Sequence, residues 1–254
     1  MKIRKYVLAA VSACTLALSA SPSNAAVTQL GFILDSSGSI GSGNWTMIVN
    51  GLSSAVSTLI PVDGSYEVSV VTFATNAVTV VNHVLIDSAA TRTSVANSIA
   101  AASFLGTTTD FALAFSTMQT ALTGSSNFSK AGTSYVNFAT DGIPNDSAAA
   151  ITGRNNLIGA GIDNISIEGI GGGVDAAYLQ NSICYPTPCD TTSPYNFPTQ
   201  GFYIAVANAN AYVAAIQNKI KIVTGQVPEP ASVALVGLAL AGLAFSRRRR
   251  PDAT

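Results

Sequence analysis

The stretch LGFILDSSGS, residues 30–39, decides the fold. Its first five residues are apolar, which predicts a strand buried on both faces, as in a parallel sheet. The strand ends in a carboxylate, Asp35, followed by two alternating hydroxyls, Ser37 and Ser39. These are hard oxygen ligands, which suit Mg²⁺, Ca²⁺ or Mn²⁺ better than zinc or copper.

Two further loops offer oxygen ligands at similar positions. The apolar run 135–140 ends in Asp141-Gly142, and residues 106–110, Gly-Thr-Thr-Thr-Asp, open a helical pattern. Ligands in sheets of this type bind beyond the carboxyl ends of the strands, so these loops are expected to converge.

Strand and helix patterns alternate along the chain. This alternation predicts an α/β fold with a doubly wound, mostly parallel six-stranded sheet and helices on both faces. Residues 67–74 and 77–86 are joined by only two residues, which predicts a hairpin and hence one antiparallel edge strand. The other strands are expected at 29–34, 135–139, 164–169 and 202–206, and the helices at 44–60, 91–104, 110–122, 147–158, 175–183 and 210–222.

The order of these loops resembles the von Willebrand factor A (VWA) domain with a metal-ion-dependent adhesion site. The family pattern is Asp-x-Ser-x-Ser after the first strand, a Thr in a Gly-rich loop, and an Asp that opens a Thr-Asp-Gly turn. The resemblance covers roughly residues 27–222 and implies a Rossmann-like fold. The corresponding residues are Asp35, Ser37 and Ser39, then Thr107 or Thr108, then Asp141.

The resemblance implies a binding module and not an enzyme. Mg²⁺, or Ca²⁺ or Mn²⁺, would leave an open coordination position for an Asp or Glu carboxylate of a protein partner. Three alternatives stay open at this point. Ser39 or Ser42 could simply cap the following helix. The chain could be a structural protein of an exopolysaccharide matrix that contacts anionic polysaccharide. Hydrolysis at the metal would need a general base, for which Asp110 and Asp146 are the candidates.

Both ends of the chain resemble processing signals. Residues 1–26 combine basic residues, an apolar stretch and small residues, which is typical of a secretory signal peptide. Residues 11–14 also resemble a lipobox, which would make Cys14 the lipidated residue. The segment 225–254 resembles a PEP-CTERM sorting signal: Pro228-Glu229-Pro230, an uncharged stretch from 231 to 246, and four arginines. The expected domain is therefore 27–224.

That tail implies export from a Gram-negative bacterium to the cell surface or extracellular matrix, with processing by an exosortase-type enzyme. Before processing, the short apolar stretch would anchor the chain transiently in the inner membrane. The arginines would hold its end on the cytoplasmic side.

Charge and cysteine content narrow the function further. Residues 27–227 carry five basic and eleven acidic residues, a net charge of −6, which argues against nucleic acid as a partner. Cys184 and Cys189 flank a Pro-rich loop in a chain expected outside the cytosol, which predicts a local structural disulfide. His83 is the sole histidine and is expected to be a sheet residue.

Overall fold

The computed structural model describes residues 27–129 and 133–226. A six-stranded sheet runs through this part of the chain in the order β3-β2-β1-β4-β5-β6. Every neighbouring pair is parallel except β2 and β3, which are antiparallel, so β3 is the antiparallel edge strand. This confirms the predicted sheet. The strands are β1 (Thr28–Asp35), β2 (Tyr66–Phe73), β3 (Ala77–Leu85), β4 (Thr133–Thr140), β5 (Asn164–Ile170) and β6 (Tyr203–Val206).

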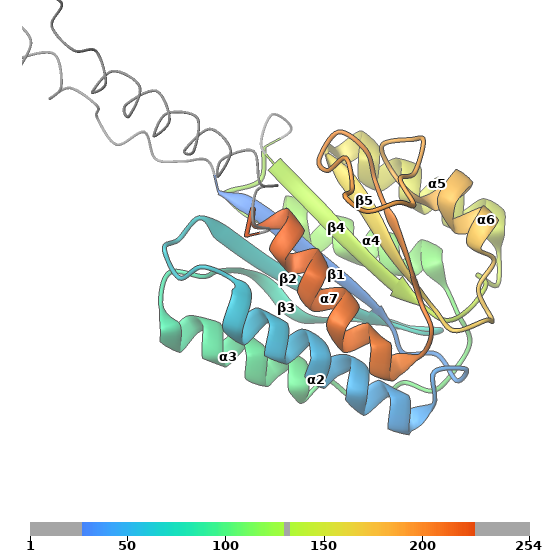
Figure 1. Ribbon diagram of the computed structural model, residues 1–254, viewed down its shortest axis with the longest axis horizontal. Coiled ribbons are helices and arrows are strands. Elements are labelled where there is room, and N and C mark those ends of the chain that lie inside the picture. The colour runs from blue at the N-terminus through green and yellow to red at the C-terminus, as the bar shows by residue number, and fades with distance from the viewer. Residues whose placement is uncertain (1–26, 130–132, 227–254) are drawn as a thin grey trace, which may run out of the picture.

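Helices cover both faces of the sheet (Figure 1). The helices α2 (Gly41–Leu59), α3 (Ala89–Ala100) and α7 (Ala209–Val223) pack on one face. The other face is covered by α4 (Phe111–Thr123), α5 (Ser147–Ala160) and the short α6 (Ala176–Tyr178), which continues into the π-helical turn η1 (Leu179–Ile183). The strand β1 lies at the centre, where β2 and β4 flank it, so its carboxyl end is the point at which the strand order reverses.

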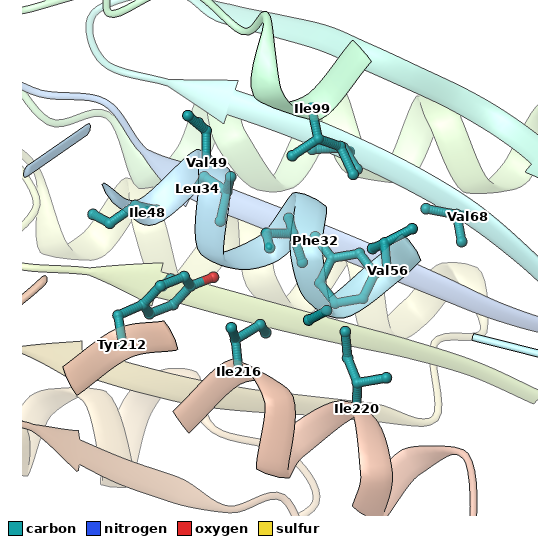
Figure 2. Close-up of a cluster of buried hydrophobic side chains, with 14 of the residues drawn as sticks. Phe32, Leu34, Ile48, Val49, Val56, Val68, Ile99, Tyr212, Ile216 and Ile220 are labelled. Atoms are coloured by element: carbon teal, nitrogen blue, oxygen red, sulfur yellow. The ribbon is translucent and has the colours of Figure 1, made fainter. Parts of the chain in front are cut away.

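Apolar residues from α2, α7 and β1 fill the space between the sheet and the helices α2, α3 and α7. Figure 2 shows side chains of α2 (Ile48, Val49 and Val56) and of α7 (Ile216 and Ile220) within this core. In the helices these residues recur at helical spacing, which is the pattern that places them on one face. Burial of this face fixes α2 and α7 against the strand that ends at Asp35.

Several predicted boundaries differ from the structure by a few residues. The helix α3 begins at Ala89 and not at residue 91, because the hydroxyl of Ser88 accepts a hydrogen bond from the backbone N–H of Thr91 and caps it. It ends at Ala100 and not at 104, since the following residues form a loop tied to Ser36. The predicted helix 175–183 is only partly α-helical, because its second half forms the π turn.

The predicted terminal segments lie outside the described residues. This applies to the signal peptide, to Cys14, and to the apolar stretch and arginines of the tail. Among residues 27–129 and 133–226, no helix is both long enough and apolar enough to cross a membrane.

Candidate metal site

Asp35 lies buried at the end of β1 with both carboxylate oxygens engaged. Its Oδ1 accepts a hydrogen bond of 2.8 Å from the backbone N–H of Ser37, and its Oδ2 accepts one of 2.6 Å from the hydroxyl of Thr140 at the end of β4. The two strands are neighbours in the sheet, which brings these groups together. The aspartate therefore organises the loop that follows β1.

The two serines and Asp141 form a continuous chain of oxygens. The hydroxyls of Ser37 and Ser39 lie 3.1 Å apart, and the Ser39 hydroxyl donates a hydrogen bond of 2.8 Å to Oδ1 of Asp141. Ser39 and Asp141 are 102 residues apart in sequence. The structure thus brings two of the three predicted loops into direct contact.

Ser39 and Ser42 do not cap α2. The helix begins after Ile40, and no side chain accepts a capping hydrogen bond at this end. The hydroxyl of Ser39 is directed to Asp141 instead. The helix-cap interpretation of this serine is therefore wrong.

Backbone hydrogen bonds attach the Gly-rich loop, residues 106–110, to the loop that follows β1. The N–H of Gly38 donates to the carbonyl of Thr107 at 2.7 Å, and the N–H of Gly106 donates to the carbonyl of Ser36 at 2.9 Å. The hydroxyl of Thr107 accepts a hydrogen bond from the N–H of Thr75. The structure therefore brings the third predicted loop to the site but directs Thr107 toward the β2–β3 turn.

Thr108 also contacts the β2–β3 turn. Its hydroxyl lies 2.8 Å from that of Thr75 and accepts a hydrogen bond of 3.0 Å from the side-chain amide of Asn145. These two contacts already use the hydroxyl of Thr108.

Thr109, which the sequence reasoning passed over, lies beside Ser39 and Gly142. A Cβ atom placed on Gly142 would lie 3.7 Å from the hydroxyl of Thr109 and 3.8 Å from that of Ser39. The two hydroxyls thus approach the same point next to Asp141. The backbone of Thr109 is held there by Asn145, whose N–H donates to the Thr109 carbonyl at 2.9 Å.

The two carboxylates are in an environment that favours a cation. Burial raises the pKa of Asp35 to about 6, hydrogen bonds from Ser37 and Thr140 oppose this rise, and the charge of Asp141 adds to it. Burial also raises the pKa of Asp141, while the hydrogen bond from Ser39 opposes that rise. Within the described ranges, neither carboxylate has a Lys, Arg or His partner in an ion pair. Positive charge supplied from outside would therefore stabilise both groups.

The donor set fits a hard divalent cation of the Mg²⁺ type. In the described part of the chain, no three His, Cys, Asp or Glu side chains gather to hold a metal. The site instead offers two carboxylates and three hydroxyls. Mg²⁺ is commonly bound through one or two carboxylates and keeps several waters, so a site of this composition suffices. Zinc would favour nitrogen or sulfur ligands, and the site residues supply neither.

Asp110 and Asp146, the two candidate bases, are both helix caps. Asp110 accepts a hydrogen bond of 2.9 Å from the N–H of Leu113 at the start of α4, and Asp146 accepts two of 2.9 Å from Ala148 and Ala149 at the start of α5. Removing such caps costs about 1 kcal/mol of stability. Their carboxylates therefore have a structural explanation.

Cys184 and Cys189 are joined by a disulfide with a Cα–Cα distance of 5.8 Å. It closes the loop that follows η1, well along the chain from the oxygen cluster. Arg154 binds the carbonyl of Cys184 at 2.7 Å, which holds this loop against α5.

Residues 29–210 match the von Willebrand factor type A domain. The chain belongs to this family. Residues 226–250 match the PEP-CTERM protein-sorting motif, which marks export in Gram-negative bacteria, attachment at the cell surface and processing by an exosortase. Comparison with the curated proteins gave no match.

Solved structures of VWA proteins share the fold. Proximal thread matrix protein 1 from the mussel byssus, in a form with a zinc-occupied MIDAS motif, has a TM-score of 0.62 at 16% identity, over 78% of this chain and 48% of that protein. A von Willebrand factor type A protein from Catenulispora acidiphila has a TM-score of 0.59 at 14% identity, over 77% and 42%. Manganese-loaded TRAP from Plasmodium vivax has a TM-score of 0.51 at 22% identity, over 77% and 74%.

These similarities establish the architecture of the VWA chain. It spans about half the length of the mussel matrix protein. Among the structural neighbours are matrix proteins and a pilus adhesin, and the named metals in two of them are divalent. An exported adhesion-type VWA module is thus consistent with both sequence motifs.

Proposed function

We propose that the protein is an exported adhesion module that captures a partner carboxylate at a divalent metal ion. Ser37, Ser39 and Thr109 would hold the ion through their hydroxyls, with Asp141 and Asp35 as its charged neighbours. Mg²⁺ is the preferred ion, and Ca²⁺ or Mn²⁺ are alternatives. When bound, the ion supplies a Lewis-acidic position at which an outside carboxylate replaces water.

The observation that carries this proposal is the 2.8 Å hydrogen bond between Ser39 and Asp141. It joins the loop after β1 to the loop after β4 and places a hydroxyl and a carboxylate oxygen at one point. Ser39 is exposed and Asp141 is partly exposed, so a partner can reach this point from solvent. Asp35 is buried behind them, which suits it to orient the loop more than to touch the partner.

Thr109 replaces Thr107 and Thr108 in this proposal. The hydroxyls of those two residues are engaged with Thr75, whereas that of Thr109 approaches Ser39 and Gly142. The Gly-rich loop then contributes one hydroxyl ligand, and the other two threonines attach it to the β2–β3 turn.

A partner with an exposed Asp or Glu fits the charge of the site best. Two carboxylates and one divalent cation are close to neutral overall, so a further carboxylate is not repelled. No acid–base pair is required, which agrees with a binding role and no catalysis. The matrix alternative remains a second proposal, because a neighbour of this fold is a byssus matrix protein; the ion would then hold a uronic-acid polymer.

A pull-down from a native cell-surface extract tests the proposal. Protein on the beads should retain a partner in Mg²⁺ and release it in EDTA, and Asp141→Ala should retain none. Asp87→Asn is the matched control, because it also removes one negative charge. Asp87 follows β3, whose residue Leu85 pairs with Glu67 near the start of β2, whereas Asp35 pairs with Phe73 at the end of that strand.

The result separates the alternatives. Mg²⁺-dependent retention of a protein, lost after its carboxylates are amidated, supports capture of a protein carboxylate. Retention of alginate but no protein favours the matrix alternative. Equal retention by wild type and Asp141→Ala, with or without EDTA, contradicts both.

A further inference from the structure

A cluster of polar side chains lies buried on the α7 side of the sheet, apart from the metal site. Asn137 lies in β4, Glu168 in the neighbouring β5, and Lys219 and Tyr212 in α7. All four are 5% exposed or less. A lysine, a carboxylate and a carboxamide rarely share a buried position without a role or a full set of hydrogen bonds.

These four residues hold unsatisfied polar atoms. In the described part of the chain, the buried side-chain nitrogen and oxygen atoms without a hydrogen bond are both polar atoms of Asn137, both carboxylate oxygens of Glu168, the Nζ of Lys219 and the hydroxyl of Tyr212. Lys219 Nζ lies 3.3 Å from Glu168 Oε1, but without hydrogen-bond geometry. Burying this many polar atoms without hydrogen bonds lowers the stability of the fold unless a reaction removes some of these atoms.

The lysine and the asparagine border the same small cavity, and each of them interacts with the carboxylate of Glu168. Asn137 and Lys219 both line a cavity of about 20 Å³. The Asn137 amide lies near enough to Glu168 to lower the pKa of that carboxyl. Phe202, which is fully buried, has its ring centroid 5.0 Å from Lys219 Nζ. Figure 2 shows Tyr212 turned from α7 into the interior of this layer.

We propose that Lys219 and Asn137 form an intramolecular isopeptide bond, with Glu168 as the proton carrier. Glu168 contacts Lys219 directly and lies beside the Asn137 amide, which is the arrangement that such a transfer needs. This inference does not rest on the metal site.

The reaction balances without any further reagent. The Nζ lone pair attacks Cγ of Asn137, and Glu168 in its acid form protonates the amide oxygen. A proton from Nζ passes through Glu168 to Nδ2. As the Cγ–Nδ2 bond breaks and ammonia leaves, the proton on the amide oxygen returns to Glu168. An amine and a primary amide thus become a secondary amide and ammonia, and Glu168 ends in its original protonation state.

The electrostatics favour the reactive forms. Burial lowers the pKa of Lys219 and raises that of Glu168, so both groups shift toward the neutral amine and the neutral acid. The neutral amine is the nucleophile and the neutral acid is the proton donor. The product also removes the buried primary amine and primary amide, which lacked hydrogen-bond partners.

The bond would tie the last helix to the middle of the sheet. The PEP-CTERM motif begins directly after α7, so a pull on the tail acts on the body through this helix. A covalent link from α7 to β4 would transmit that force directly to the sheet, without relying on noncovalent packing. Such a link would be useful in a protein attached to a surface.

Peptide mass spectrometry of the full-length protein tests the proposal. After reduction, trypsin cleavage sites predict separate peptides 131–154 and 155–219 if no bond forms. The isopeptide bond would block cleavage at Lys219 and give 131–154 joined to 155–221. The mass of this joined peptide would be about 17 Da lower than the summed masses of 131–154 and 155–221. The joined peptide is the expected result.

Variants make the result specific. Glu168→Gln should give only the separate peptides 131–154 and 155–219. Lys219→Met lacks the cleavage site at 219 and should give 131–154 and 155–221, not joined. Lys221→Met, on the exposed side of the same helix, should keep the ammonia loss in its intact mass. Separate, unmodified peptides from the folded wild-type protein would overturn the proposal. Loss of ammonia without a joined peptide would overturn it too, because that result describes cyclisation of an asparagine and not a cross-link.

Discussion

Thr140 donates a 2.6 Å hydrogen bond to Oδ2 of Asp35, which links the carboxyl ends of β4 and β1 across 105 residues of sequence. The next residue after Thr140 is Asp141, so one strand end both holds the buried carboxylate and presents the exposed one. This pairing fixes the distance between the serine loop and the Asp141 loop.

Thr140→Val should weaken Mg²⁺ binding while keeping the shape of the side chain. Hydrogen bonds to charged groups contribute about 1.5–3 kcal/mol, so the Kd should rise by at least about tenfold. Calorimetric titration measures it. Thr152→Val is the matched control, because its hydroxyl bonds only the Ala148 carbonyl on the surface of α5. An unchanged Kd in Thr140→Val would mean that Asp35 needs no such support.

Thr109 should matter more to metal binding than either preceding threonine. Thr109→Val removes the hydroxyl that approaches Ser39 and should raise the Kd for Mg²⁺ by about tenfold or more. Thr108→Val removes a contact with Thr75 and should change it much less. The reverse order of the two effects in a Mn²⁺ binding titration would return the ligand role to Thr108.

Gly173 supports the Asp141 loop by its small size. A Cβ on Gly173 would lie 2.8 Å from the backbone carbonyl of Asp141, closer than real contacts allow, whereas a Cβ on Gly172 would meet nothing within 4 Å. Gly173→Ala should therefore displace Asp141 and reduce Mg²⁺ binding, and Gly172→Ala should leave it intact. Equal affinities of the two variants for Mg²⁺ would show that the Asp141 loop can shift without affecting the site.

The disulfide should stabilise the fold modestly. Its cysteines are five residues apart, and the chain-entropy relation for so short a loop gives about 2 kcal/mol. Urea unfolding with and without reductant should show this loss. The double variant Cys184→Ser/Cys189→Ser is the control and should not respond to reductant. A wild-type midpoint that is unaffected by reductant would contradict the expectation.

The sheet was predictable because its signals are local. The apolar run before Asp35 and the two-residue link between β2 and β3 determine a buried strand and an edge hairpin without reference to the rest of the chain. Asp35, Ser37, Ser39 and Asp141 follow such strands directly. The parallel topology places them together at the carboxyl ends of the strands.

The choice among three consecutive threonines was not local. It depends on Thr75 in the β2–β3 turn and on Asn145 after β4, both of which form hydrogen bonds to the loop. Neither contact leaves a pattern in residues 106–110. Counting along the sequence therefore could not weigh Thr109, the ligand that we propose, against Thr107 and Thr108.

The buried cluster did leave a signal in the sequence. Glu168 is the one charged residue of the strand segment ISIEGI, 165–170, which the structure buries completely. A charge inside such a strand needs a partner, and Lys219 on α7 is that partner. The sequence does not show that the partner is Lys219 or that Asn137 lies nearby. Both depend on the packing of α7 against β4 and β5.

Titration of Mg²⁺ into the metal-free protein by calorimetry tests the central claim most directly. The account predicts saturable binding at one site, which Asp141→Ala abolishes and Asp87→Asn retains. Circular dichroism should show both variants folded. Mg²⁺ and Mn²⁺ binding of equal affinity in wild type and Asp141→Ala, or no binding of either ion to the folded wild-type protein, would contradict it.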